Sequence, residues 1–599
     1  MALMNQNNGI VNRISGPVVE GIGMENARLH NMVRVGENKL VGEIIRLQQK
    51  QATIQVYEDT SGLRIGEPIE ETGQPLVAEL GPGLMGGIFD GLQRPLTRLA
   101  ELSGGFLARG MIESALDHKK QWDFKPSVSE GAVLSAGDIV GTIQETKSIQ
   151  HRVMVPPGMQ GTVTAIHSGM IDASQPVAVL RADDGQELQV PLIKQWPVRT
   201  PRPYLSRLDL SEPLITGKRI IDLFFPISKG GSAIIPGGFG TGKTVLQQSL
   251  ARWSDVDVVV YVGCGERGNE MAEVLNQFPT LEDRVSGNPL IDRTVLIANT
   301  SNMPVAAREA SIYMGITIAE YYRDMGYHVL MLADSTSRWG EALREVSGRL
   351  EEIPGEEGYP AYMASRLAEF YERAGHVRCL QNPAPADLRG GSISLVGAVS
   401  PPGGDFSDPI TQNSMRIAGV FWALDYELSR RRHFPAINWN KSFALVDLAR
   451  YFTENVADDF SELVQEALAI LGRENELQQV VQLIGQDALS DIEREFLLAA
   501  RILREDILQQ SGVQDTDNFC SIDKSYWMLK AVLEFHRQAQ KAVGFGKELQ
   551  DIETLPCLEK IARMKELPLL SATAQIAELI KDIDAQFSGL SLAAEQVDA

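Results

Sequence analysis

The 599-residue sequence has few cysteines, and the four that it has lie far apart. Cys264, Cys379, Cys520 and Cys557 form no CxxC pair and are too sparse for a disulfide framework. This cysteine usage predicts a reduced, cytoplasmic compartment.

Long apolar runs are missing as well. No stretch approaches the roughly 18 apolar residues of a membrane span, so we expect no transmembrane helix. The first residues, MALMNQNNGIVNRI, lack a basic segment followed by an apolar one, and we therefore expect no secretory signal. Neither absence prevents the protein from docking on a membrane complex.

Basic residues are outnumbered by acidic ones. The 56 Lys and Arg residues stand against 78 Asp and Glu residues, which gives a net charge of −22 at pH 7. Surfaces that bind nucleic acid are basic, so this balance argues against nucleic acid as a partner. The excess of acidic residues favours solubility and is compatible with a local basic pocket for a nucleotide.

The chain does contain a succession of differently patterned regions. At about 100–200 residues per domain, its length predicts three to five domains. We predict a multidomain α/β protein with an N-terminal β-barrel at 1–75, a linker at 76–109, an inserted β-rich domain at 110–195, a P-loop nucleotide-binding α/β domain at 196–440 and a C-terminal helical domain at 441–599.

The first two of these domains are predicted from short strand-like segments. NMVRVGE and QATIQVYED in the first region, and GTVTAIHSG in the second, are rich in Val, Ile and Thr and are bounded by turn residues. Several short strands close together favour a small barrel. The Pro- and Gly-rich segment LGPGLMGGIFDGLQRPL is typical of a linker.

The last two domains follow from different periodicities. From about residue 200 to 440, strand-like and helix-like segments alternate, which indicates a parallel sheet. VDVVVYVG and HVLMLAD are almost continuously apolar, as strands buried on both faces are. Beyond residue 441 apolar residues recur at helical spacing, as at Leu463, Ala467 and Leu471, and predict a helical bundle.

One segment carries a phosphate-binding pattern, Gly237-x-x-x-x-Gly242-Lys243-Thr244, between the strand-like SAIIP and an apolar helix. The glycines let successive backbone N–H groups point at phosphate oxygens. Lys243 places a charge on the terminal phosphates, and Thr244 offers its hydroxyl to Mg²⁺. We predict that the whole segment binds a nucleotide: Gly237, Gly238, Phe239, Gly240, Thr241, Gly242, Lys243 and Thr244.

Two acidic residues follow apolar strands. Asp334 follows VLMLA and is predicted to hold Mg²⁺ through water, with a helix cap as the alternative. Glu266 ends VVVYVGCGE and is predicted to position or activate the attacking water, with an ordinary surface acid as the alternative. Arg267 beside it is predicted to stabilise charge on the γ-phosphate. Cys264 is expected to be a buried filler.

These segments together resemble the catalytic A subunit (alpha chain) of V-type rotary ATPases, including the archaeal and bacterial V/A-type enzymes. The resemblance covers essentially the whole chain and is carried by FFPISKGGSAIIPGGFGTGKT, GCGERGNEMAEVL, LMLADSTSRWGEALREVSGRLEEIPGEEGYPAY, SPPGGDFSDPIT and RRRHFPAINWNKSF. It implies a RecA-like core, and the region 110–195 is similar to the extra domain of A subunits.

The resemblance also implies roles for individual residues. It implies catalytic roles for Glu266, Lys243, Arg267 and Arg338. Asp334 takes the Walker B position, and Arg338 is a further γ-phosphate contact. Phe434 would cover the adenine and Phe519 would form the opposite wall, since stacking needs only a flat apolar ring; the alternative for both rings is a core position.

The partners implied by the resemblance are those of a rotary motor. Mg-ATP would be hydrolysed or synthesised at the interface with a B subunit in an alternating A3B3 ring, with an arginine of the B subunit completing the site. Opening and closing of residues 441–599 would drive a central stalk, with peripheral stalks and, indirectly, a membrane rotor for H⁺ or Na⁺. The ring would lie on the cytoplasmic face of a membrane.

Two positions depart from the family's phosphate loop. Gly238 stands where the family has proline, and Thr241 stands where it has serine or cysteine. The extra glycine is expected to loosen the loop. Lys243 and Thr244 are unchanged, so hydrolysis is still expected.

Three alternatives belong to other functional classes. A non-catalytic ring subunit normally lacks the loop lysine or the counterpart of Glu266, and this chain has both. A hexameric RNA helicase or a type III export ATPase would lack the insertion at 110–195, and a helicase would show a basic, aromatic N-terminal domain. A scaffold protein that binds phosphate incidentally is the third.

Overall fold

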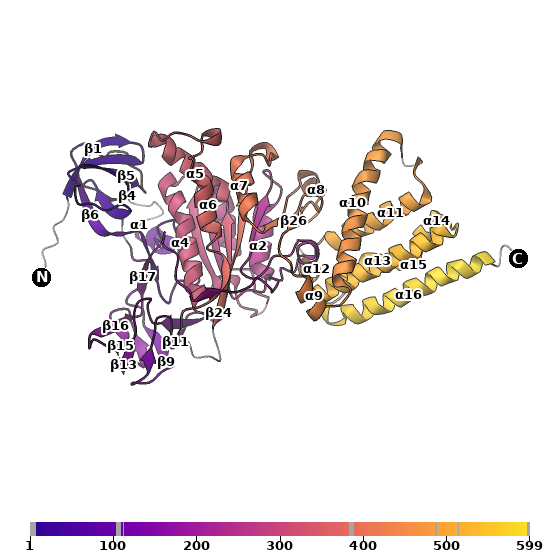
Figure 1. The fold of residues 1–599 in the computed structure, drawn as a ribbon, viewed down its shortest axis with the longest axis horizontal. Helices are drawn as coiled ribbons and strands as arrows, with labels where there is room; N and C mark the ends of the chain where they lie inside the picture. Colours follow the sequence, from indigo (N-terminus) through magenta and orange to yellow (C-terminus); the bar gives the residue numbers. More distant parts are fainter. Residues whose placement is uncertain are drawn as a thin grey trace. The chain divides into compact units, whose positions relative to one another are not determined.

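The computed structural model describes residues 8–103, 109–111, 113–284, 286–381, 389–485, 488–512 and 514–595 (Figure 1). The first seven residues of the predicted barrel, residues 104–108 of the predicted linker and the last four residues of the predicted helical domain lie outside this range. The chain divides into two compact units. The first comprises Met1–Asp209, Val256–Pro401 and Asp405–Ile417, and the second comprises Leu210–Asp255, Pro402–Gly404 and Ala418–Ala599.

The first unit begins with a closed antiparallel barrel. Its strands, in their order around the barrel, are β1 (Asn8–Ser15), β2 (Val18–Ile22), β5 (Gln51–Val56), β4 (Leu40–Gln48), β3 (Asn31–Val35) and β6 (Pro68–Pro75). Along β3 every second residue is buried, as the alternation of side chains across a strand requires. Closure leaves no free strand edge. The predicted N-terminal barrel is confirmed.

The inserted β-rich module consists of two four-stranded sheets. One has the order β10 (Val133–Leu134), β13 (Gly161–Ile166), β15 (Pro176–Arg181), β16 (Glu187–Pro191), and the other β12 (Gln150–Met154), β11 (Ile139–Gln144), β9 (Trp122–Pro126), β14 (Gly169–Ile171). Buried apolar residues of both sheets, among them Phe124 and Leu180, share one core. The chain enters and leaves the module side by side, because β7 (Val77–Leu80) pairs with β17 (Lys194–Pro197).

The rest of the first unit is built on parallel strands. Their order is β24 (Gly390–Val399), β22 (His328–Asp334), β20 (Val258–Glu266), β21 (Thr294–Thr300) and β8 (Ile88–Phe89). Every residue of β20 is buried, which explains its unbroken apolar sequence. The other elements of this unit are α1 (Leu96–Ser103), β18 (Ser206–Arg207), α3 (Gly268–Gln277), α4 (Val305–Asp324), α5 (Thr336–Arg349), α6 (Met363–Tyr371), β23 (Gly375–Arg378) and α7 (Pro409–Ile417).

The second unit joins a short sheet to the C-terminal helices. Strand β19 (Ser232–Pro236) runs parallel to β25 (Val420–Phe421), which pairs with β26 (Phe443–Ala444); α2 (Lys243–Trp253) and α8 (Tyr426–Arg430) flank them in sequence. The helices that follow are α9 (Ala449–Asn455), α10 (Phe460–Ile484), α11 (Asp491–Ile502), α12 (Asp515–Asn518), α13 (Ile522–Gly544), α14 (Leu549–Glu553), α15 (Pro556–Arg563) and α16 (Leu569–Glu595).

Helix α13 is the centre of this helical part. It packs against α10, α11 and α16 (Figure 1), and 13 of its residues are buried. The predicted helical C-terminus is therefore confirmed. None of the described helices combines the length and the apolar content that crossing a membrane requires.

Candidate nucleotide-binding and catalytic site

The phosphate loop joins β19 to α2, and its glycines are needed by the backbone. Gly240 and Gly242 have φ angles of 78° and 92°, in the left-handed region that favours glycine. A Cβ on Gly237 would lie 2.5 Å from Oγ1 of Thr241. Gly238 differs: a Cβ there would meet nothing nearer than Cα of Gly404, at 3.9 Å. No close contact therefore requires a glycine at position 238, where the family has proline.

Lys243 is held against the loop itself. Its ammonium donates to the carbonyl oxygens of Gly237 at 2.7 Å and Gly238 at 2.9 Å, and Oγ1 of Thr241 donates to the latter at 2.9 Å. Thr244 follows in the first turn of α2, where backbone N–H groups have no partner within the helix. A helix start with a lysine and a hydroxyl is suited to binding phosphate, as the sequence predicts for this segment. The side chain of Phe239 is 72% exposed.

The two predicted base-binding rings lie in different environments. Phe434 is half-buried, and its carbonyl oxygen accepts from the N–H of Gln510 at 2.7 Å. Phe519 is only 4% exposed and lies 5.8 Å from the ring of Trp253. The burial of Phe519 is that of a core residue, the alternative considered for it, and its contact with a base stays a prediction.

The predicted catalytic carboxylates lie at one edge of the parallel strands in the first unit. Strands β20 and β22 are neighbours in register, with Gly263 opposite Asp334, so Glu266 and Asp334 both lie at the carboxyl edge where α/β folds bind ligands. Glu266 forms an ion pair with Nε of Arg338 at 3.3 Å. Asp334 is 1% exposed and accepts from the hydroxyl of Tyr261 at 3.1 Å.

The electrostatics of this edge favour a positive charge. Burial, followed by the negative charge of Asp334, raises the pKa of Glu266 to about 8, although Arg338 acts in the opposite direction. Two carboxylates that repel each other in a buried place bind a proton or a cation well. Among the described residues no group of three or more His, Cys, Asp or Glu side chains could hold a metal by itself.

Other residues support Glu266, and the sequence did not single them all out. Gly265 has a φ of 73°, and a Cβ on it would lie 2.7 Å from Nε of Arg308. Arg308 donates to the carbonyl oxygen of Ser301 at 3.2 Å. The N–H of Ser301 in turn donates to the carbonyl oxygen of Glu266 at 2.8 Å. Arg308 gave a signal in the sequence, because it and the adjacent Glu309 are charged residues in the otherwise apolar start of α4. Tyr261 gave none.

Two further residues complete this edge. Arg267 lies on the exposed surface just before α3, next to Glu266 in the chain. Cys264 is buried, and burial raises the pKa of its thiol to about 12, which suits the expected packing role.

The structure therefore brings the predicted residues together in two sets. The phosphate loop, Phe434 and Phe519 belong to the second unit, and Glu266, Arg267, Asp334 and Arg338 belong to the first. That both sets act on one nucleotide stays a prediction from the sequence.

Four protein-family models match the chain. They are the β-barrel domain of the ATP synthase alpha/beta family at residues 11–73, the barrel-sandwich domain of ATP synthase alpha/beta subunits at 113–199, the nucleotide-binding domain of the ATP synthase alpha/beta family at 217–444 and the C-terminal domain of V- and A-type ATP synthases at 449–552.

Similar proteins cover nearly the whole chain. The A subunit of the A-type ATP synthase of Methanopyrus kandleri is 55% identical over 98% of this chain and 99% of its own length. The V-type ATP synthase alpha chain 1 of Clostridium tetani is 52% identical over 97% of this chain and 98% of its own. Among solved structures, the assembled ATPase EscN of the enteropathogenic E. coli type III secretion system matches with a TM-score of 0.61 at 21% identity, over 88% of this chain and 100% of that one. The last likeness concerns the fold alone.

Proposed function

Because this chain belongs to the family of A-type and V-type ATP synthase A subunits (alpha chains), we propose how its residues bind and hydrolyse ATP. It is the catalytic subunit of a rotary ATPase, and its ATP hydrolysis or synthesis is coupled to ion transport across a membrane. The observation that carries this conclusion is the identity of 55% over 98% of the chain. A non-catalytic subunit, a helicase and an export ATPase are not favoured.

The phosphates bind at the start of α2. Lys243 exchanges its bonds to the carbonyl oxygens of Gly237 and Gly238 for bonds to the terminal phosphate oxygens. The glycines from Gly237 to Gly242 supply backbone N–H groups around the phosphates. Phe434 stacks on the adenine, and Phe519 supports the base site from the protein core.

Mg²⁺ fits the donors that these residues offer. Thr244 and Asp334 supply a hydroxyl and a carboxylate, the hard oxygen ligands that Mg²⁺ prefers, with Asp334 acting through water. Bound Mg²⁺ would neutralise charge on the transferred phosphoryl group. Positive charge beside Asp334 also lowers the pKa of Glu266, since the repulsion between the two carboxylates contributes to raising it.

Glu266 acts on the attacking water. Its carboxylate orients the water toward the γ-phosphorus, and its ion pair with Arg338 fixes the direction of the carboxylate. Lys243, Arg267 and Arg338 neutralise charge that develops in the transition state. In synthesis the same groups act in reverse.

The chain works as part of an ATP synthase complex. We assign it to an alternating A3B3 ring with B subunits, one of whose arginines completes each site. The ring drives a central stalk, is held by peripheral stalks and acts on a membrane rotor from the cytoplasmic face. The five regions inferred from the sequence, with boundaries at 75, 109, 195 and 440, are our proposed domain division.

Reconstitution tests this assignment. The chain is mixed with a candidate B subunit, and ring formation is measured together with Mg-ATP turnover. We expect a ring that turns over ATP, and a matched ring with Lys243→Ala that assembles without turnover. A wild-type ring that assembles and binds ATP but hydrolyses none would identify a non-catalytic subunit instead.

A further inference from the structure

Lys218 is a charged residue of the second unit that the proposed mechanism does not use. Its side chain is completely buried. Its ammonium donates to both the carbonyl oxygen and Oδ1 of Asn518, 300 positions along the chain. Burial lowers the pKa of this lysine to about 7. Removing an ammonium group from water is energetically unfavourable, so a methionine or leucine would be more stable at this place if packing were the only role of the residue.

The ammonium of Lys218 faces the ring that we assign to the adenine. It lies 5.5 Å from the centroid of the Phe434 ring, within the range of a cation–π interaction. A Cβ on Gly512 would lie 3.6 Å from the same ring, and the carbonyl oxygen of Gly512 accepts from Nδ2 of Asn518 at 3.1 Å. Lys218 and Asn518 therefore bond each other and contact the ring and its neighbouring loop.

The same pair reaches the phosphate-binding helix. Oγ of Ser249 donates to Oδ1 of Asn518 at 3.3 Å. Ser249 lies on α2, the helix that begins at the phosphate-binding Lys243. One asparagine side chain thus connects the helix under the phosphates with the lysine under the base ring.

The backbone around this connection is fixed by the next residue in the chain. The N–H of Arg219 donates to Oε1 of Gln510 at 2.7 Å, and its guanidinium pairs with Asp517 at 2.6 Å. Gln510 in turn donates its N–H to the carbonyl oxygen of Phe434. These bonds hold the main chain near Phe434 and Asn518. The side chain that faces the Phe434 ring is that of Lys218.

We propose that Lys218 is a positioning residue for the nucleobase. Through Asn518 and the Phe434 ring it fixes the position of the stacked base relative to helix α2. The base and the triphosphate of one purine nucleotide can then occupy their sites at the same time. This inference rests on the proposed function, because it requires Phe434 to stack on the base.

The test uses Lys218→Met in the assembled ATP synthase complex. We measure KM and kcat for Mg-ATP and the inhibition constant of Mg-tripolyphosphate, which has no base. The expected result is a KM for ATP about tenfold higher, a kcat within about twofold of wild type and an unchanged inhibition constant for tripolyphosphate, because only the base has lost its register. An inhibition constant that rises as much as KM would overturn the proposal, since it would show damage to the phosphate site.

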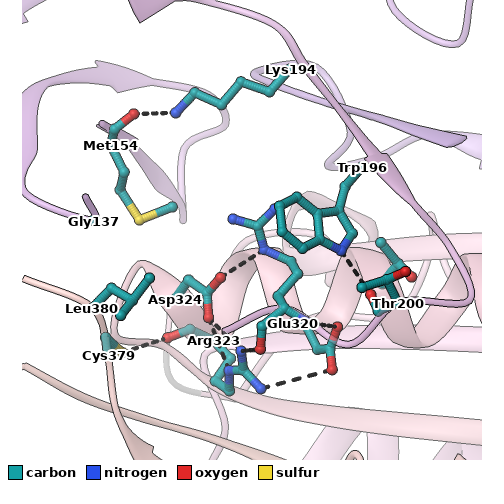
Figure 2. Close-up of polar contacts among 12 residues, drawn as sticks. Gly137, Met154, Lys194, Trp196, Thr200, Glu320, Arg323, Asp324, Cys379 and Leu380 are labelled. Atoms are coloured by element: carbon teal, nitrogen blue, oxygen red, sulfur yellow. Dashed lines mark hydrogen bonds and ion pairs between the residues drawn. The ribbon is translucent and has the colours of Figure 1, made fainter. Parts of the chain in front are cut away.

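Lys194 offers a matched control in the first unit. It is also buried, its ammonium also donates to a backbone carbonyl oxygen, that of Met154, and its pKa is also lowered to about 7 (Figure 2). Lys194→Met should leave the KM for ATP unchanged. An equal rise of KM in this control would assign the effect to any buried lysine.

Two further variants keep the outcome decisive. Asn518→Ala keeps the main-chain acceptor for Lys218 but removes the side-chain bonds, and we expect KM to rise about threefold even if Lys218→Met fails to fold. An unchanged KM in Asn518→Ala counts against the proposal. Phe434→Ala separates the two hypotheses: a raised KM there with an unchanged KM in Lys218→Met rejects only the positioning role, whereas an unchanged KM in Phe434→Ala rejects the stacking role itself.

Discussion

The two sets of predicted catalytic residues are built in opposite ways. The phosphate loop of the second unit is built from backbone groups: Gly240 and Gly242 have positive φ, and the ammonium of Lys243 bonds to the loop's own carbonyl oxygens. The acidic edge of the first unit is formed by buried side chains, with Glu266 only 6% exposed and bonded to Arg338. A phosphate cradle needs room and backbone N–H groups, whereas charge acts strongly only where water is excluded.

The phosphate loop and the acidic edge therefore depend on different features. Bonds to backbone groups can be exchanged at little cost, so the loop is suited to taking up and releasing phosphates. The buried acids cannot rearrange without leaving charges unpaired, so they are suited to acting on a water at one fixed place. The variants below test this contrast, from the largest expected effect to the smallest.

Removing the charge of Lys243 from the loop should have the largest effect. Lys243→Ala leaves the terminal phosphates without their cation, and we expect kcat/KM to fall by at least about 10³-fold. Mg-ATP turnover and nucleotide binding by the reconstituted complex measure it. Turnover within tenfold of wild type would mean that the loop binds through its backbone alone.

Removing the Glu266 carboxyl group from the buried edge should separate binding from chemistry. Glu266→Gln keeps the shape of the side chain but cannot accept a proton, so we expect turnover to fall by about 10²–10⁴-fold with the Kd for Mg-ATP within a few-fold of wild type. Single-turnover hydrolysis and equilibrium binding are the measurements. Near-wild-type hydrolysis would remove the catalytic role of Glu266.

Buried charge in the first unit should also appear in the pH dependence of stability. The folded-state pKa of Lys194, lowered to about 7 by burial and the nearby Arg202 but opposed by Asp324, lies below its ordinary value of 10.5. Between these two values the unfolded chain binds more protons than the folded one, so stability rises with pH. Relative to Lys194→Met, the wild-type free energy of unfolding should rise between pH 7 and pH 10 by on the order of 1 kcal/mol per pH unit.

Thermal unfolding of both chains at several pH values measures this difference. A difference that does not change with pH would show that the lysine keeps its proton when folded. Asp324 lies at the end of α4 (Figure 2), and Nε of Arg202 donates to its carboxylate at 2.6 Å.

The smallest effect concerns the two kinds of glycine in the loop. Gly238 has open space around it and no positive φ, so Gly238→Ala should stabilise the chain by about 0.4–1 kcal/mol and leave turnover within about twofold. Gly242 has a φ of 92°, so Gly242→Ala is the matched variant that should destabilise the chain by at least about 1 kcal/mol and impair turnover. Chemical denaturation of both variants compares them. Equal effects would show that the loop does not require a glycine in the left-handed conformation at position 242.

Much of the fold could be predicted from the sequence because its signals are local. The loop pattern lies within eight residues, and the apolar run of β20 directly precedes Glu266. The barrel, the β-rich module, the parallel strands and the C-terminal helices were predicted from periodicity, and the structure and the family models confirm them. Since parallel strands end at one edge, the placement of Glu266 and Asp334 at strand ends also followed from the pattern.

Other features came only from tertiary structure. Tyr261 bonds Asp334 across 73 positions, and Lys218 reaches Asn518 across 300. A tyrosine within an apolar strand, or a lysine between two short segments, gives no sign of its partner in a single sequence. The amino-acid sequence by itself determined which groups can bind phosphate and act on water, because those properties belong to side chains and to short backbone patterns. Packing decided which of those groups lose contact with water and which distant partners they meet, and burial and neighbouring charge set the pKa of Glu266 and the surroundings of Lys218.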